Sequence, residues 1–334
     1  MWFASASNGR GSVKRRSVLA GTGALLAAPA LRAQPTWHPT RPFRIIVTYP
    51  PGGVNDIVAR IIAEPLSREL GQPVLIENRA GAGGNIGTVA AAQAEPDGHT
   101  ILFGTTALFG VNPILYAASG VDAGRDFTSL GTIGEVANIL SVIPGRVQAT
   151  DVAGFIEEAK RRPMIYGSVG NGSSSHLSAA LFLSMIGIEA THVPYRGSSP
   201  LVAAMLAREV DFGFDTTATS TAHIRARSLR ALAVTTTTRA GALPDVPTMQ
   251  EAGLAGYDLG IWFNLGVPRR TPAPVVARLA DALERARDAV PTRERLRTAF
   301  VEPLALPLAG NEAFIKSSAE RWQAIARAAR VSVD

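Results

Sequence analysis

The 334-residue sequence contains no cysteine. Disulfide bonds, thiolate metal sites and a cysteine nucleophile are therefore excluded. Histidine is scarce as well: the chain has five, and none stands in a His-Glu-x-x-His pattern, which argues against a zinc site. Beyond the N-terminal region, no apolar run approaches the ~20 residues that a membrane-spanning helix needs. We therefore expect neither a metal nor any other cofactor.

A large charge imbalance is also missing from most of the chain. The formal net charge is +6, with 33 lysines and arginines against 27 acidic residues. Residues 1–33 contain five of the basic residues and no acidic one, so the rest of the chain is almost neutral, with 28 against 27. No basic stripe is interleaved with aromatic residues there. We therefore do not expect the protein to bind nucleic acid.

The first 33 residues have the three parts of an export signal. A basic segment ends at Lys14-Arg15-Arg16, and a small, mildly apolar stretch runs from Ser17 to Leu31. Small residues then offer a cleavage site near Ala30 or Ala33. This pattern predicts a signal peptide over residues 1–33, of the twin-arginine type, and a periplasmic mature protein. An uncleaved membrane anchor is the alternative, but glycine, threonine and proline dilute its short apolar stretch.

The remaining chain alternates between β-rich apolar runs and helical patterns. Its length predicts two domains, and the alternation predicts parallel sheets with helices on both faces. The expected fold class is therefore α/β, with two α/β lobes and a ligand cleft between them. The expected strands cover residues 43–49, 74–77, 100–103, 139–143, 164–169, 191–195, 210–214 and 229–235. The expected helices cover residues 55–70, 86–94, 151–160, 173–185, 200–208, 274–290 and 312–329.

Ligands of open α/β sheets bind beyond the carboxyl ends of the strands, where loops enter helices. In the loop over residues 49–56, Gly52 and Gly53 let backbone N–H groups approach a ligand, and the helix that follows begins with partial positive charge. These features predict a carboxylate site that needs no lysine or arginine. The alternative is a plain strand-to-helix turn in which Asp56 stabilises the first helical turn.

A second loop, over residues 168–176, has the same character. It contains two glycines together with hydrogen-bond donors such as Asn171 and Ser173, which is more than a helix cap requires, so we interpret it as a second ligand cradle. Asp215, at a strand end, either accepts a hydrogen bond from a ligand or caps a helix. Thr105 is a weaker candidate of the same kind, and Arg196 is either a ligand partner or a solvated charge.

Two enzyme functions, dinucleotide binding and hydrolysis, fit the sequence poorly. The Gly81–Gly87 segment has the wrong glycine spacing for a dinucleotide fingerprint, and no acidic residue follows at the required distance. A hydrolase built from Ser173, His176 and Asp215 would lack the strained G-x-S-x-G elbow. An exported Ser/His hydrolase nevertheless stays open as the alternative function, as does a ligand-sensing subunit of a signalling system.

Several ordered segments resemble one known family, the Bug-type, TctC-like periplasmic solute-binding proteins of tripartite tricarboxylate transporters. The resemblance runs from about Trp37 to Ala329. The segments that show the resemblance include PPGGVNDIVAR (50–60), GQPVLIENRAGAGGNIG (71–87), GNGSSSHLSA (170–179) and HVPYRGSSP (192–200). The resemblance implies a type II periplasmic binding protein fold. Lobe 1 would comprise residues 37–136 plus 260–334, and lobe 2 residues 137–259.

The resemblance also implies a function and a site. The protein would be no enzyme but a monomeric binding protein that captures a small carboxylate by lobe closure and delivers it to membrane transporter components, or signals to a sensor kinase. Residues 106–110 depart from the usual family segment, so contacts with the ligand would differ at that loop. Ligand-binding residues carried over from the family or inferred from the loops are Tyr49, Gly52, Gly53, Asp56, Thr105, Ser168, Asn171, Gly172, Ser173 and Asp215.

Overall fold

The structure is a computed structural model that describes residues 37–306 and 308–329. The predicted signal peptide and its cleavage sites lie outside these residues. A search of the described part of the chain for helices long and apolar enough to cross a membrane finds none.

The first sheet has six strands in the order β11-β4-β10-β3-β1-β2. Strand β1 pairs in parallel with both β2 and β3, whereas β10 runs antiparallel to β3 and β4. The sheet is therefore mixed. Its strands are β1 (Phe43–Val47), β2 (Val74–Asn78), β3 (Thr100–Thr105), β4 (Phe127–Val136), β10 (Ile261–Pro268) and β11 (Glu302–Pro303).

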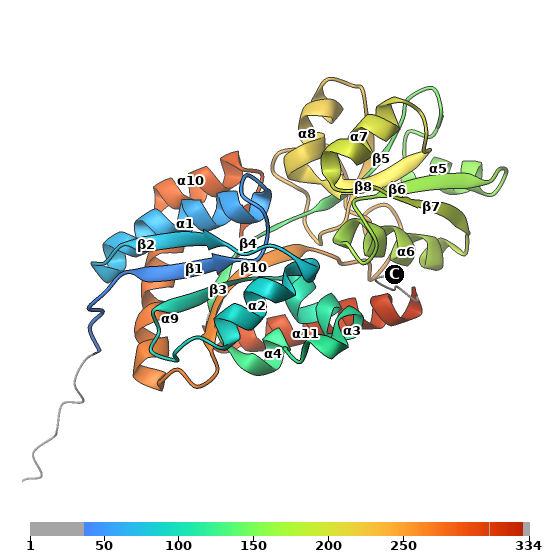
Figure 1. Cartoon of the computed structure of the whole chain (residues 1–334). Coiled ribbons are helices and arrows are strands. Elements are labelled where there is room, and N and C mark those ends of the chain that lie inside the picture. Colours follow the sequence, from blue (N-terminus) through green and yellow to red (C-terminus); the bar gives the residue numbers. More distant parts are fainter. Residues whose placement is uncertain (1–36, 307, 330–334) are drawn as a thin grey trace, which may run out of the picture. The chain divides into compact units, whose positions relative to one another are not determined.

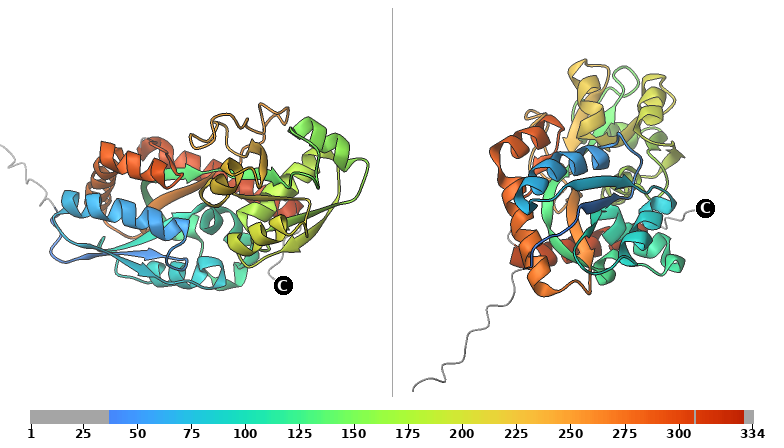
Figure 2. Two further views of the ribbon diagram at one scale, coloured as in Figure 1. Left: turned by 90° about the horizontal axis from the view of Figure 1, so that it is seen from above. Right: turned by 60° about the vertical axis from the view of Figure 1, so that its left-hand side comes forward.

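Helices cover both faces of this sheet (Figures 1 and 2). Alternation along β1 explains the two layers, because Phe43, Ile45 and Val47 pack against α1, α9 and α10, whereas Ile46 points to the opposite face with α2 and α11. The main helices are α1 (Val54–Leu70), α2 (Asn85–Ala92), α9 (Ala273–Asp288), α10 (Val290–Thr298) and α11 (Leu308–Ala328). Short segments complete this part: η1 (Ala82–Gly84), η2 (Ala107–Val111), α3 (Asn112–Leu115), η3 (Ala117–Ser119) and α4 (Ala123–Asp126).

The second sheet has five strands in the order β7-β6-β8-β5-β9. Helices α5 and α6 pack on one face around Phe155 and Phe182, and α7 packs on the other around Leu201 and Met205. The strands are β5 (Asn138–Val142), β6 (Met164–Ser168), β7 (Ala190–Pro194), β8 (Phe212–Thr216) and β9 (Arg230–Val234). The helices are α5 (Val152–Ala159), α6 (Ser174–Ile186), α7 (Ser198–Leu206) and α8 (Thr217–Arg225).

The two sheets share one topology. In each, the first parallel strand (β1 or β6) lies between the second (β2 or β7) and the third (β3 or β8). The next strand, β10 or β5, is antiparallel to its neighbours, and each is reached directly from the other sheet, since β4 leads into β5 and β9 precedes β10. The expected α/β class with two sheets and helices on both faces is confirmed, but the prediction of purely parallel sheets is wrong, because β10 and β5 run antiparallel to their neighbours.

Candidate functional site

The loop after β1 is fixed by the carboxylate of Asp56, which is only 4% exposed. Its Oδ2 accepts hydrogen bonds from the N–H of Gly52 and the Nε–H of Arg60, both over 3.0 Å, and its Oδ1 accepts one from the Asn78 amide over 3.0 Å. The bond from Arg60 is the main reason that the pKa of Asp56 lies below its ordinary value. Both carboxylate oxygens are engaged within the protein, so Asp56 holds the loop in shape.

The start of α1 leaves backbone donors available. Gly53 precedes the helix and provides no side-chain cap. The N–H groups of Val54 and Asn55 belong to the first turn, whose donors have no acceptor within the helix. Because the helix dipole also places partial positive charge here, this end of α1 favours an anion.

The loop between β6 and α6 is braced from inside. The Ser173 hydroxyl donates to the carbonyl oxygen of Gly170 over 2.6 Å and accepts from the His176 backbone N–H over 3.2 Å, so Ser173 caps α6. The Gly172 N–H donates to His176 Nδ1 over 3.2 Å. At the end of β6, the Ser168 hydroxyl lies 2.7 Å from His192 Nε2. The loop is therefore held by its own side chains.

Two stacked imidazole rings lie behind this loop. The ring centroids of His176 and His192 are 4.1 Å apart with planes 13° from parallel, and Tyr166 stacks on His192 at 4.7 Å. Burial, and then the neighbouring His192, lowers the pKa of His176 to about 4. Burial also lowers the pKa of His192. His176 is consequently neutral near pH 7, which is the form whose Nδ1 can accept the Gly172 N–H.

Asp215, at the end of β8, is 2% exposed and also fully engaged. Its Oδ1 accepts the Ser198 hydroxyl over 2.7 Å and the Thr216 N–H over 2.8 Å, and its Oδ2 accepts the Thr219 hydroxyl over 2.7 Å. Burial raises the pKa of Asp215 above its ordinary value. The carboxylate ties together the starts of α7 and α8, although the N-cap residue of α8 is Thr216 and not Asp215.

Residues from both sheets line one cavity of about 230 Å³. Its polar lining consists of hydroxyl and amide side chains: Tyr49, Asn55, Thr105, Thr106, Ser173, Ser174 and Thr216. Its apolar lining consists of Val54, Ala107, Val111, Val136, Val169, Ile261, Phe263 and Trp322.

Three helix starts meet in this cavity. Val54 and Asn55 begin α1, Ser173 and Ser174 begin α6, and Thr216 precedes α8. Each helix start follows the carboxyl end of a strand, β1 in the first sheet and β6 and β8 in the second, which is where ligands of α/β sheets bind. None of the described residues that line the cavity carries a formal charge. Among the lining residues, partial positive charge is therefore supplied by the backbone dipoles of the helix starts.

Of the predicted site residues, three line the cavity directly: Tyr49, Thr105 and Ser173. The hydroxyls of Tyr49 and Thr105 are 3.3 Å apart and hydrogen bonded. The other seven lie outside the lining set, in the adjoining loops or at the ends of α1, β6 and β8: Gly52, Gly53, Asp56, Ser168, Asn171, Gly172 and Asp215. Arg196 is outside the lining set as well.

Sequence reasoning missed the cavity residues that come from other parts of the chain. Trp322 comes from α11, Phe263 from β10 and Val111 from η2. Trp322 is seated against Gly110, where a Cβ atom would lie 2.7 Å from the Trp322 Cβ. Residues 106–110, which differ from the usual family segment, therefore have a physical role. The absence of a Cβ atom at Gly110 lets η2 pack on α11 beside the cavity.

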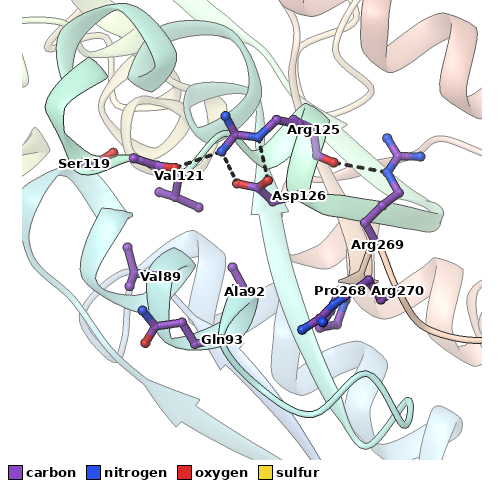
Figure 3. A pocket seen from close by; sticks show the side chains of 11 residues that line it. Val89, Ala92, Gln93, Ser119, Val121, Arg125, Asp126, Pro268, Arg269 and Arg270 are labelled. Atoms are coloured by element: carbon purple, nitrogen blue, oxygen red, sulfur yellow. Dashed lines mark hydrogen bonds and ion pairs between the residues drawn. The ribbon is translucent and has the colours of Figure 1, made fainter.

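A larger cavity, of about 470 Å³, lies between α2, α4 and the end of β10 (Figure 3). It is lined in part by Arg125, Arg269 and Arg270. Arg125 pairs with Asp126 over 2.7 Å, and the Arg269 side chain donates to the Arg125 carbonyl oxygen over 3.1 Å. These contacts brace the surface turn at α4. Since none of the predicted site residues lines this cavity, we take the 230 Å³ cavity as the candidate site.

The hydrolase alternative finds no support in the geometry. Its proposed nucleophile, Ser173, directs its hydroxyl to a backbone oxygen, and the His176 imidazole faces the Gly172 N–H. The Ser168–His192 pair has hydrogen-bond geometry, but Ser168 is fully buried and out of reach of a substrate. A serine needs both an adjacent base and access to act as a nucleophile.

Comparisons with known proteins agree with the fold. Residues 58–331 match the model of the tripartite tricarboxylate transporter family receptor, TctC. The chain is 36% identical over 321 residues to the UPF0065 protein in the tcbD-tcbE intergenic region of Pseudomonas sp. (strain P51), covering 93% of this chain and 94% of the relative. It is 31% identical to protein BugT of Bordetella pertussis, covering 87% and 90%.

Solved structures give the same result. Rhodopseudomonas palustris Rpa4515 with adipate superposes with a TM-score of 0.77 at 34% identity, covering 88% of this chain and 99% of that one. MatC from Rhodopseudomonas palustris with bound malate has a TM-score of 0.73 at 29% identity, covering 86% and 99%. These neighbours confirm the expected periplasmic binding protein fold. The chain belongs to the tripartite tricarboxylate transporter receptor family, and like its Bug-type, TctC-like relatives it is a solute-binding protein and not an enzyme.

Proposed function

We propose that this protein captures a small carboxylate in the 230 Å³ cavity and holds the acid group at the starts of α1, α6 and α8. The observation that carries this proposal is the convergence of three helix starts in a cavity lined by uncharged residues. First-turn N–H groups and helix dipoles bind anions without a cationic side chain. The adipate and malate bound to the two related proteins support the same ligand class.

The residues of the proposed site have two kinds of role. Tyr49, Thr105 and Ser173 line the cavity and contact the ligand, together with Asn55, Ser174 and Thr216. The remaining predicted residues do not line the cavity. They hold in place the loops from which the helices begin. These supporting residues are Gly52, Gly53, Asp56, Ser168, Asn171, Gly172 and Asp215.

Capture would occur by closure of two lobes around the ligand. We assign residues 37–136 plus 260–334 to lobe 1 and residues 137–259 to lobe 2. Sheet membership supports this division, since β4 ends at Val136, β5 begins at Asn138 and β10 begins at Ile261. A ligand that contacts both lobes stabilises the closed form, because only that form completes its contacts.

The family supports the proposed cellular role. The N-terminal 33 residues direct export by the twin-arginine route, with cleavage near Ala30 or Ala33, and the mature protein acts as a periplasmic monomer. Its closed, loaded form is recognised by the membrane components of a tripartite tricarboxylate transporter. A sensor kinase is the second possible partner, and the same closed form would serve it.

A charge placed at one helix start tests the proposal. Ser174→Asp puts a fixed carboxylate at the start of α6 within the cavity, where it repels an incoming acid while suiting the helix dipole. We expect at least a 100-fold loss of carboxylate affinity by isothermal titration calorimetry, with an unchanged or higher melting temperature.

Ser199→Asp is the matched control. It makes the same change in the first turn of α7, on an exposed residue outside the cavity lining. It should leave the affinity within a factor of three of wild type. Unchanged carboxylate binding in Ser174→Asp would mean that the acid does not lie at the start of α6.

A further inference from the structure

We infer that the cavity selects a monocarboxylate with an apolar body about the size of a benzene ring, in preference to dicarboxylates and amino acids. This inference rests on the proposed function, because it concerns the ligand that the same cavity holds. It is carried by three observations: the cavity's uncharged lining of hydroxyl, amide and apolar side chains, the neighbouring buried carboxylates, and the cavity's volume.

The lining combines hydroxyl and amide groups with apolar side chains, and Thr105 lies directly opposite Phe263 in the sheet. The hydroxyl and amide groups belong mainly to the helix starts and to the end of β3. The apolar part includes Val111, Val136, Ile261, Phe263 and Trp322, from η2, β4, β10 and α11. A single carboxylate at the helix starts would leave the rest of a ligand against these side chains. A second carboxylate among them would lose its hydration without gaining a cationic partner.

The carboxylates nearest to the cavity are not free to bind a ligand ammonium. Asp56 lies one residue after Asn55, and Asp215 lies one residue before Thr216, which both line the cavity. The two oxygens of each carboxylate already accept hydrogen bonds from within the protein. An amino acid would therefore bury its charged amino group without a carboxylate partner, so the cavity disfavours amino acids.

The volume of the cavity and the aromatic rings in its lining set the size and shape of the ligand's apolar part. An apolar cavity of ~150 Å³ holds one benzene molecule, so at the same packing 230 Å³ accommodates about nine non-hydrogen atoms, the number in benzoate. Tyr49, Phe263 and Trp322 contribute aromatic rings to the lining. Flat aromatic rings pack favourably against such side chains.

Titration of four acids tests the inference on the mature protein, unfolded and refolded to remove any bound ligand. We expect benzoate or hexanoate to bind at least tenfold more tightly than adipate and malate. Adipate or malate binding as tightly as either monoacid, or more tightly, would overturn the inference while leaving the proposed function intact. If none of the four acids bound, the proposed function would fail, and this inference with it.

A second variant reverses the expected preference. Ile261→Arg places a cation in the apolar part of the lining, on a side chain that is already partly exposed and can carry a charge. We expect the ratio of benzoate to adipate affinity to fall at least tenfold. Val290→Arg, on the 66% exposed Val290 of α10, controls for added charge and should leave the ratio unchanged. An unchanged ratio in Ile261→Arg would also overturn the inference.

Discussion

The backbone N–H of Gly52 donates a hydrogen bond to Asp56 Oδ2 over 3.0 Å, which closes the loop between β1 and α1 on itself. Gly52 reaches this position with φ at +84°, a conformation that suits a residue without a Cβ atom. The same carboxylate holds Asn78, at the end of β2, and Arg60, one turn along α1. The start of α1 therefore has a fixed position before any ligand arrives.

Replacing Asp56 with alanine should weaken ligand binding although this side chain is not a ligand contact. The N–H of the exposed Gly52 and the amide of the half-buried Asn78 would lose their acceptor, and a hydrogen bond of this kind contributes about 0.5–1.5 kcal/mol. We expect a lower free energy of unfolding in urea and a carboxylate affinity reduced at least tenfold.

Glu64→Ala is the control for Asp56→Ala, since it removes another α1 carboxylate that pairs with Arg68 and Arg295 at the surface. Exposed pairs of this kind contribute little to stability, so both stability and affinity should stay near wild type. Equal effects of the two variants would show that the Asp56 network does not position the helix start.

Stability should depend on pH through His176. Its pKa of about 4 in the folded protein lies below the ordinary value of 6.5, so protons bind the unfolded chain more readily and acid favours unfolding. The loss begins as the pH falls below about 6.5, continues to about pH 4 and amounts to roughly 3 kcal/mol at most. The melting temperature measured between pH 7.5 and 4 should follow this course.

His176→Asn removes the titrating ring but keeps an acceptor, the amide Oδ1, near the position of Nδ1, where it can accept the Gly172 N–H. The variant should lose less stability than wild type over the same pH range. Some pH dependence should remain, because burial also lowers the pKa of His192. Parallel curves for the variant and the wild-type protein would rule out His176 as the group responsible.

Trp322 should report ligand binding directly. Its indole lines the cavity, whereas Trp262 lies outside the lining set and donates from its Nε1 to the Ser318 hydroxyl over 2.8 Å. A carboxylate ligand should therefore change the tryptophan emission of the wild-type protein and of Trp262→Phe. In Trp322→Phe the change should be largely lost while calorimetry still detects binding. A full fluorescence change in Trp322→Phe would place the ligand away from α11.

The alternating pattern of apolar runs predicted most of the helices and strands. Phe43 to Val47 alternate between two helical layers, and α1 begins one residue before the expected helix. The sequence did not predict β4 and β10, the two strands of the first sheet that connect to the second sheet. In β10, buried residues follow one another without alternation from Trp262 to Pro268, because helices cover both faces of this part of the sheet.

The sequence also predicted part of the candidate site. The glycine-rich loops mark the strand ends, so the sequence leads to Tyr49, Thr105 and Ser173. Which donors each loop turns inward depends on hydrogen bonds such as those of Asp56 and Asp215, and these depend on tertiary structure. Trp322 comes from the last helix, more than 200 residues beyond Thr105, and no local pattern connects the two.

The most direct measurement is a calorimetric comparison of an acid with its uncharged amide, benzoate against benzamide or adipate against adipamide. The two members of each pair have nearly the same shape and differ in the negative charge that the helix starts would bind. We predict that the acid binds at least 100-fold more tightly than the amide. Equal affinities within either pair that binds would contradict the account, because the dipoles of α1, α6 and α8 would then contribute nothing to capture.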